Sequence, residues 1–245
     1  MNLLSRFEQA HLQAKSNRWL RYFTVFCRIA LAAGFLPSGF VKIAGERFTS
    51  LSVNHPMGHY LEALHETSYY YTFIGIVQVT AAILLLIPRT ATLGAVLYFP
   101  IILNICILSL AVRFEGSLLS SPLMVLANTY LLFWDYDKLK FILPFNRSPH
   151  DAFLRQQTRS TKFPMAFFAS SAAAVFILVL IITNLFEIQP HNTIPDCEIQ
   201  CKDNDNPQAC IDFCNCIHVQ GRPIEKCLEA YKKAKRNNNL KSQSK

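Results

Sequence analysis

The fold class follows from Ala172-Ala-Ala-Val-Phe-Ile-Leu-Val-Leu-Ile-Ile182, the centre of an apolar run that extends over residues 165–186. A run of this length matches the about 20 helical residues that cross the hydrocarbon core of a bilayer. Of the 245 residues, 51% are hydrophobic and 16% are charged, which is too apolar for an ordinary soluble domain of this size. The sequence therefore indicates a membrane protein whose spans are helices.

Four further apolar runs precede this one, over residues 19–43, 69–87, 91–112 and 118–134. The links at 88–90 and 113–117 are so short that the second, third and fourth runs must form antiparallel hairpins. The first run contains Arg28 and Pro37, and the fourth contains Pro122 and Asn128. We expect these two helices to be tilted or kinked and to pack against their neighbours. The predicted fold is an all-α, polytopic membrane helical bundle of four spans with a fifth span added.

The basic residues lie beside the spans and give the chain an orientation. They cluster before the first run, at Arg89 and between residues 138 and 162. Positively charged loops stay in the cytoplasm, so the N-terminus is predicted inside and the C-terminus outside. We expect a bacterial inner (plasma) membrane protein with its last segment in the periplasm or outside the cell. The formal charge of +8 thus reflects membrane topology, and the expected contact is the lipid bilayer, with no nucleic acid.

Six of the eight cysteines follow the fifth span, in the compartment where disulfides form and persist: Cys197, Cys201, Cys210, Cys214, Cys216 and Cys227. The first two and the next two are each spaced one helical turn apart, on either side of a turn sequence at 203–207. Two short antiparallel helices would favour the pairs 197–214 and 201–210, and leave 216 for 227. Other connectivities stay open, as do a catalytic dithiol at Cys214-x-Cys216 and a zinc site with His218 nearby.

Three segments resemble the DoxX family of small bacterial membrane proteins. They are Arg28-Ile-Ala-Leu-Ala-Ala-Gly-Phe-Leu-Pro-Ser-Gly-Phe-Val-Lys42, Phe73-Ile-Gly-Ile-Val-Gln-Val-Thr-Ala-Ala-Ile-Leu-Leu-Leu-Ile-Pro-Arg89 and Leu93-Gly-Ala-Val-Leu. The resemblance covers about residues 21–141. It implies a four-span bundle with an arginine near the start of the first helix and a Gly-x-x-Lys near its end, here Arg28, Gly39 and Lys42. Relatives include membrane subunits similar to those of a thiosulfate:quinone oxidoreductase and proteins associated with oxidative stress.

Arg28 is the leading candidate for an intramembrane site, because an unpaired cation at the centre of a span costs about 2.5–3.5 kcal/mol or more. The amides Gln78, Asn104 and Asn128 are the polar side chains of the next three spans, and Lys42 ends the first. Together these residues predict a polar pocket at mid-membrane for a quinone carbonyl or a small oxyanion. The alternatives are that Arg28 reaches the headgroups, that Lys42 anchors the helix end, and that the amides only join helices.

The loop between the first two spans contains a second group of titratable residues. Pro56 begins a predicted short helix that carries His59, Glu62, His65 and Glu66. The first, second and fourth of these share one face, and the spacing is suitable for a metal or for proton transfer. An amphipathic helix lying at the membrane surface explains the same pattern. Cys27 and Cys106 are isolated within spans and are predicted to be inert.

The predicted domains are a cytoplasmic N-terminus (1–18), the DoxX-like bundle (19–143), a basic linker (144–164), the fifth span (165–187), a periplasmic cysteine-rich domain (188–236) and a disordered tail (237–245). The leading hypothesis is a redox-associated membrane component that acts between a small sulfur or thiol compound and quinone. A non-enzymatic assembly protein that docks a periplasmic partner, and a small-solute permease, are the alternatives.

Overall fold

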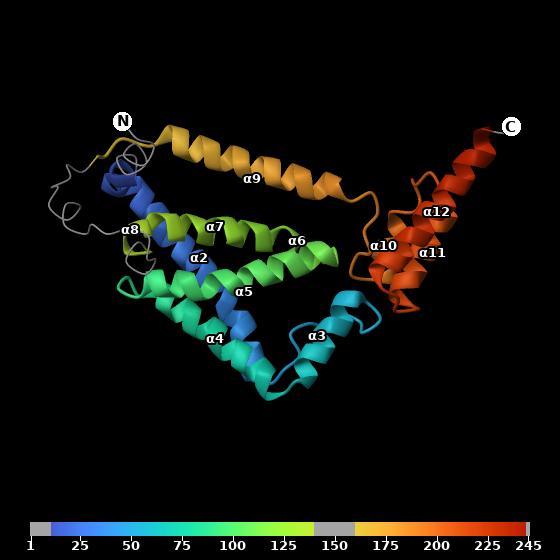
Figure 1. Cartoon of the computed structure of the whole chain (residues 1–245), viewed down its shortest axis with the longest axis horizontal. Coiled ribbons are helices and arrows are strands. Elements are labelled where there is room, and N and C mark those ends of the chain that lie inside the picture. The colour runs from blue at the N-terminus through green and yellow to red at the C-terminus, as the bar shows by residue number, and fades with distance from the viewer. Residues whose placement is uncertain (1–10, 140–159, 244–245) are drawn as a thin grey trace. The chain divides into compact units, whose positions relative to one another are not determined.

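The computed structural model describes residues 11–139 and 160–243, and in these residues all regular secondary structure is helical, without a strand (Figure 1). Among them, five helices are long and apolar enough to cross a membrane. They are α2 (Arg18–Ile43), α4 (Tyr69–Leu86), α5 (Ala91–Ala111), α7 (Ser120–Trp134), which follows the one-turn helix α6 (Glu115–Leu118), and α9 (Met165–Leu185). Their ends lie close to those of the predicted runs, so the prediction of a helical membrane protein is confirmed.

Short helices connect and follow these spans. Helix α3 (Pro56–Glu66) begins where His55 Nδ1 accepts a hydrogen bond from the backbone N–H of Met57, and α8 (Tyr136–Leu139) follows α7. The C-terminal part contains α10 (Ile194–Ile199), α11 (Pro207–His218) and α12 (Ile224–Gln243). Thr193 and Asn206 cap the first two of these with their side chains, the role that such residues fill at helix starts.

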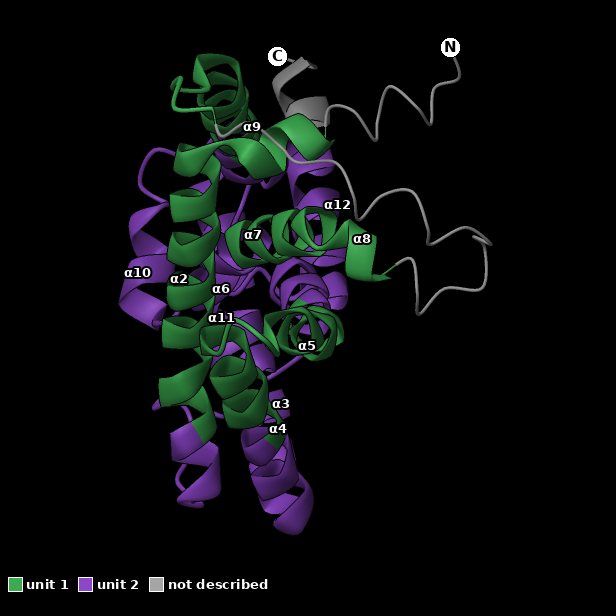
Figure 2. Ribbon diagram, turned by 90° about the vertical axis from the view of Figure 1, so that its left-hand side faces the viewer, with its two compact units in different colours: residues 1–39, 77–102, 123–178 green, residues 40–76, 103–122, 179–245 purple. Residues whose placement is uncertain are grey.

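The chain divides into two compact units, shown in green and purple in Figure 2. Unit 1 comprises residues 1–39, 77–102 and 123–178, and unit 2 comprises residues 40–76, 103–122 and 179–245. Each unit therefore combines parts of several spans, and unit 2 also holds the loop that carries α3 and the cysteine-rich segment.

The core of unit 1 is built on one stripe of α2. Its buried residues recur every three or four positions, which places them on one face of the helix: Leu20, Thr24, Cys27, Leu31 and Phe35. The Phe35 ring stacks on Tyr98 of α5, whose hydroxyl donates to the Leu31 carbonyl at 3.0 Å. Helix α4 approaches α5 so closely that a Cβ at Gly94 would lie 2.6 Å from the Leu85 nitrogen. A residue without a side chain is thus required at this contact.

Aromatic side chains join α9 to this core. Trp19 packs edge-on against Phe163 at 5.3 Å between ring centroids, and Phe23 contacts Phe167 and Phe168 at 5.6 Å each. Along its most apolar window, however, only 6% of α9 is buried by the rest of the chain. Large apolar side chains such as Phe176 (64% exposed) therefore face outward, as expected for a helix whose surroundings are lipid.

In unit 2 the cysteine-rich segment forms its own small core. Three disulfides join Cys197 to Cys214, Cys201 to Cys210 and Cys216 to Cys227, with Cα–Cα distances of 5.4–5.8 Å. These are the pairs that the one-turn spacing favoured. Around them are buried the apolar side chains of Ile188, Ala209, Phe213, Ile217, Ile224 and Tyr231. Helix α11 packs against both α10 and α12, so a cross-linked three-helix unit results.

Two predicted segments differ from the structure or lie outside it. The tail after residue 236 was expected to be disordered, but α12 continues to Gln243. Residues 237–243 contain no glycine or proline, so an existing helix can extend through them at a moderate cost per residue even though asparagine and serine are weaker helix formers, which explains the difference. Residues 1–10 of the predicted N-terminal segment, 140–143 of the predicted bundle, 144–159 of the basic linker, and 244–245 of the tail lie outside the described residues.

Candidate functional site

Arg28 faces a carboxylate in unit 1. Its guanidinium Nη2 lies 3.6 Å from Asp135 Oδ2, and the two side chains are 15% and 8% exposed. Arg28 belongs to α2, whereas Asp135 follows the last residue of α7. An ion pair so shielded from water within an apolar bundle compensates the cost of placing either charge there.

Two further residues complete this group, which we call the Arg28–Asp135 cluster: Arg28, Thr92, Asp135 and Lys138. The Thr92 hydroxyl donates to Asp135 Oδ2 at 2.8 Å, and Lys138 Nζ lies 3.2 Å from Asp135 Oδ1. Lys138 Nζ also donates to the Thr92 hydroxyl at 3.2 Å. With two cations and one carboxylate, the cluster carries an excess of one positive charge, which suits a ligand oxygen that is or becomes negative.

The backbone turn between α7 and α8 positions this cluster. The Asp135 N–H donates to the Leu131 carbonyl at 3.1 Å and so continues the helix. The Asp135 carbonyl then accepts from the N–H groups of Lys138 and Leu139, at 2.9 and 3.2 Å. This turn brings the Lys138 side chain close to the carboxylate of Asp135, which is three residues earlier in the chain.

Residues of the cluster lie near the ends of two helices. Thr92 is the second residue of α5, and Asp135 comes directly after α7. Arg28 is ten residues into α2, about 15 Å along the helix.

Asn128 lies two helical turns before Asp135 and on the same side of α7, about 10 Å away along the axis. It is fully buried, and its Nδ2 donates to the Ala95 carbonyl at 3.0 Å. Its Oδ1 is buried and has no hydrogen-bond partner among the residues that the structure describes. Since the nitrogen is already engaged, the available atom is an acceptor, which suits a ligand with an O–H or S–H group.

The other predicted pocket residues have different surroundings. Gln78 is buried, and its Oε1 accepts a hydrogen bond from the Ser38 hydroxyl at 3.4 Å. Ser38 lies on α2, ten residues after Arg28. Arg28, Gln78 and Asn128 therefore have three separate partners. In unit 2, Lys42 is buried with its Nζ 4.4 Å from the Phe48 ring centroid, and Asn104 is exposed.

The histidine and glutamate residues of α3 also have separate partners. Glu62 forms an ion pair with Arg47 at 2.6 Å, and His65 Nε2 donates to the Gly45 carbonyl at 3.1 Å. His59 and Glu66 are exposed. In the described part of the chain, the one group of His, Cys, Asp or Glu atoms close enough to share an ion is Cys201, Cys210 and Cys214.

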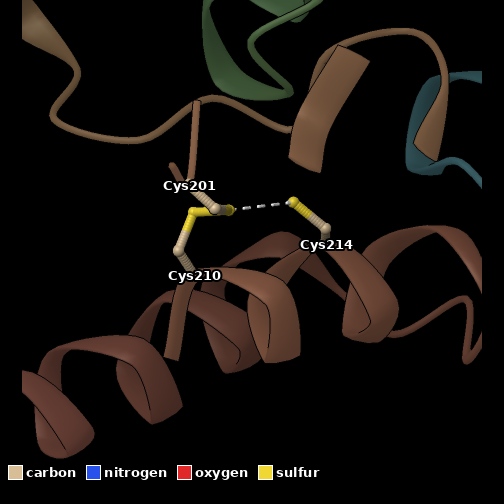
Figure 3. A group of neighbouring side chains, drawn as sticks. All are labelled: Cys201, Cys210 and Cys214. Atoms are coloured by element: carbon tan, nitrogen blue, oxygen red, sulfur yellow. Dashed lines mark hydrogen bonds between the residues drawn. A yellow bond between two sulfur atoms is a disulfide. The ribbon is translucent and has the colours of Figure 1, made fainter. Parts of the chain in front are cut away.

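These three cysteines are held in disulfides. Figure 3 shows Cys201 bonded to Cys210, with the sulfur of Cys214 4.0 Å from that of Cys201. Cys214 is bonded to Cys197, and Cys216 to Cys227, so the alternative of a Cys214–Cys216 dithiol is not the pairing found. Two residues apart on α11, their side chains leave the helix about 200° apart and cannot meet. Disulfide sulfurs are also not the thiolates that zinc requires, which argues against the zinc alternative.

Asp135 is the residue that sequence reasoning missed. It stands just beyond the fourth apolar run and is the first acidic residue after Glu115. The sequence did contain an indication of such a residue. An arginine within a span is expected to pair with an anionic side chain, and Asp135 lies at the end of another span. Which carboxylate is the partner depends on how the helices rotate against one another.

Fold and cluster together define a multi-pass helical membrane protein with buried charges in its bundle. No protein-family model matches the chain, and no solved structure matches it. It is similar to the "Uncharacterized protein YwoB" of Bacillus subtilis (strain 168), with 43% identity over 83 residues. The match covers 34% of this chain and 52% of that protein, so it spans about half of the relative's length.

Proposed function

We propose that the chain is a DoxX-like integral membrane protein that binds a quinone at the Arg28–Asp135 cluster, as a component of electron transfer between a small sulfur or thiol compound and that quinone. The observation that carries the proposal is the buried Arg28–Asp135 ion pair. Ionisable residues inside a membrane bundle are costly and are retained mainly at substrate, ion or proton sites. The DoxX-like segments at residues 28–42 and 73–89 support the same class.

The cluster has suitable groups for both states of a quinone. Arg28 and Lys138 provide N–H donors for a quinone oxygen, and their positive charge favours the negative charge that this oxygen gains on reduction. Asp135 holds the two cations in place through its carboxylate, and Asn128 Oδ1 can accept from a quinol hydroxyl. In the net reaction, two thiols are oxidised to a disulfide, and their two electrons and two protons convert the quinone to a quinol.

The test is the quinone content of the purified protein. We expect bound quinone in the lipid extract of wild type, and reduction of a quinone analogue by a thiol donor. Arg28→Gln and Asp135→Asn should each lose about tenfold or more in quinone affinity, the value of a hydrogen bond to a charged group. Arg21→Gln, an exposed arginine of the same helix, is the matched control.

Equal quinone content in the four proteins, each eluting as a single folded species, would exclude the site. A solute flux into proteoliposomes that Arg28→Gln abolishes, without any bound quinone, would replace the proposal by the permease alternative.

The proposed location is a bacterial inner membrane, with the N-terminus in the cytoplasm and the cysteine-rich domain in the periplasm or outside the cell. The distribution of basic residues supports this orientation. Three disulfides around a buried core support it as well, because such bonds persist in oxidising compartments. Thiol labelling of single cysteines placed at Lys226 or Lys15 in intact cells tests the orientation: the first should react with an impermeant reagent and the second should not.

The cysteine-rich domain favours a second candidate function, the docking of a periplasmic protein. All six of its cysteines are in disulfides, so it presents a cross-linked module without a free thiol. A partner that co-purifies with the full chain, and is lost when the chain is truncated after Pro190, would support this function. Retention of the partner by the truncated chain would exclude it.

A further inference from the structure

We infer that unit 2 contains a second binding site, a cavity of about 500 Å³ that takes a small, uncharged polyhydroxyl compound such as a mono- or disaccharide. Its volume lies in the range of about 300–1,000 Å³ that is usual for small-molecule sites. Its walls include Ser50, Ser52, Asn54, Phe114, Asn192 and His218. None of these residues belongs to the Arg28–Asp135 cluster, so the inference is independent of the proposed function.

Four segments far apart in the sequence form the cavity. They are the loop before α3, the residue before α6, the segment that leads into α10, and the end of α11. His218 Nε2 donates to the Pro190 carbonyl at 2.6 Å, and Arg113 donates to the Ile188 carbonyl. His191 pairs with Glu115. These contacts hold the walls together. Of the side chains that make them, only His218 also lines the cavity.

The loop before α3 is itself held in shape. Arg47 Nη2 donates to the Leu51 carbonyl at 2.8 Å, and the His55 N–H donates to the Ser52 carbonyl at 3.0 Å. A Cβ at Gly58 would overlap the Ser52 carbonyl, so α3 lies directly on this loop. A wall fixed in this way loses little conformational entropy when a ligand binds.

The chemistry of the lining points to an uncharged ligand. No aspartate, glutamate, lysine or arginine is among the described residues that line the cavity. Its polar side chains are hydroxyls, amides and the imidazole of His218, whose Nε2 already donates to Pro190. Hydroxyls and amides both donate and accept hydrogen bonds, as the hydroxyls of a sugar do. The Phe114 side chain offers an apolar surface for the C–H face of a sugar ring.

One polar atom requires a partner. The Oδ1 of Asn192 is buried and accepts no hydrogen bond from the residues that the structure describes. A buried acceptor without a donor costs about 1–3 kcal/mol, and rotation of the Asn192 side chain toward a ligand hydroxyl in the cavity would relieve this cost. We therefore expect Asn192 to contribute to affinity.

The experiment measures binding by calorimetry to the full chain in detergent. Glucose and maltose are the uncharged probes, and gluconate and glucosamine are their charged counterparts. We expect saturable binding of an uncharged probe, and a dissociation constant at least tenfold weaker for both charged ones. Asn192→Leu and Ser52→Ala should each weaken binding about tenfold, whereas Asn237→Leu, an exposed asparagine of α12, should not.

Absence of saturable binding for both uncharged probes would overturn the inference, because the cavity would then hold water only. Equal binding of the charged probes, or equal weakening by Asn237→Leu, would overturn it as well. Thermal unfolding of each variant, measured without ligand, distinguishes the loss of a ligand contact from the loss of the fold. If a variant both unfolds and binds the probe as wild type does, its residue does not contribute to the site.

Discussion

The membrane bundle and the cysteine-rich segment place polar and apolar groups in opposite ways. In unit 1, Arg28, Asn128 and Asp135 are shielded, while Phe26 and Ile29 of the same bundle are 62% and 55% exposed. In the cysteine-rich segment, apolar side chains and disulfides are buried, while Lys226 and Lys232 are exposed. The first pattern suits a lipid environment and the second suits water.

This difference in which groups are buried indicates which interactions determine the stability of each region. Apolar burial gives little preference for a packed bundle in lipid, so the bundle depends on close packing and on correctly paired polar groups. The cysteine-rich segment is too small for a large core and depends on covalent links. Changes to disulfides and to buried charges should therefore act on different regions, which the following predictions examine.

The largest effect is expected from loss of all three disulfides. They close loops of 17, 9 and 11 residues, and each is worth about 2–5 kcal/mol in a small domain. Reduction, or replacement of the six cysteines by alanine, should unfold the segment from Ile188 to Tyr231 and leave the bundle folded. Limited proteolysis in detergent, with mass spectrometry of the fragments, measures both. Cleavage in α5 or α7 as fast as in α11 would refute the independence of the two regions.

The next effect concerns the ion pair. Asp135→Ala should cost about 3–5 kcal/mol, because it leaves Arg28 and Lys138 without their anion. The double variant Arg28→Met with Asp135→Leu should be clearly more stable than the sum of its single changes predicts. Thermal unfolding of the four proteins in one detergent gives the coupling. Additive losses would show that the two charges do not stabilise each other.

A smaller effect is expected from acid, and only in unit 2. Burial, with a smaller contribution from the charge of nearby His218, lowers the pKa of His55 from 6.5 to about 4, although a backbone contact to His191 acts in the opposite direction. Folded His55 thus stays neutral, and the unfolded chain takes up the proton first. Stability should fall as the pH drops from about 6.5 to about 4, by up to about 3 kcal/mol.

Chemical denaturation at pH 7 and pH 4.5 measures this loss. His55→Asn, which keeps an acceptor for the Met57 N–H, should reduce the pH dependence, and His59→Gln, an exposed control, should not. The same pH dependence in both variants would assign it to other groups.

The smallest effect on stability is expected at Asn128. Asn128→Leu removes the hydrogen bond to Ala95, worth about 0.6 kcal/mol between membrane helices, but also removes the unpartnered Oδ1. The unfolding temperature should therefore change little, while quinone retention falls if the proposed function holds. A large loss of stability with unchanged quinone content would make Asn128 a purely structural residue.

The sequence predicts the spans well because each depends on a local property. Hydropathy alone places α4 at Tyr69–Leu86 and α9 at Met165–Leu185 almost to the residue. The disulfide pairs were also favoured correctly, since the one-turn spacing of Cys197 and Cys201 leaves few ways to pair two short helices.

The candidate sites were less predictable because they depend on helix rotation. Nothing local shows that Asp135 faces Arg28, or that Gln78 faces Ser38 at another depth. The cavity beside Asn192 is formed by four segments from distant parts of the chain, so no single sequence motif predicts it.

Both tryptophans of the chain, Trp19 and Trp134, belong to unit 1, one packed on Phe163 and the other beside Asp135. Intrinsic fluorescence excited at the red edge of protein absorption therefore reports on this unit alone and is silent for the cysteine-rich segment. The native chain thus carries its own optical reporter for the charged end of the bundle, and quenching by an added quinone can be followed there without any label.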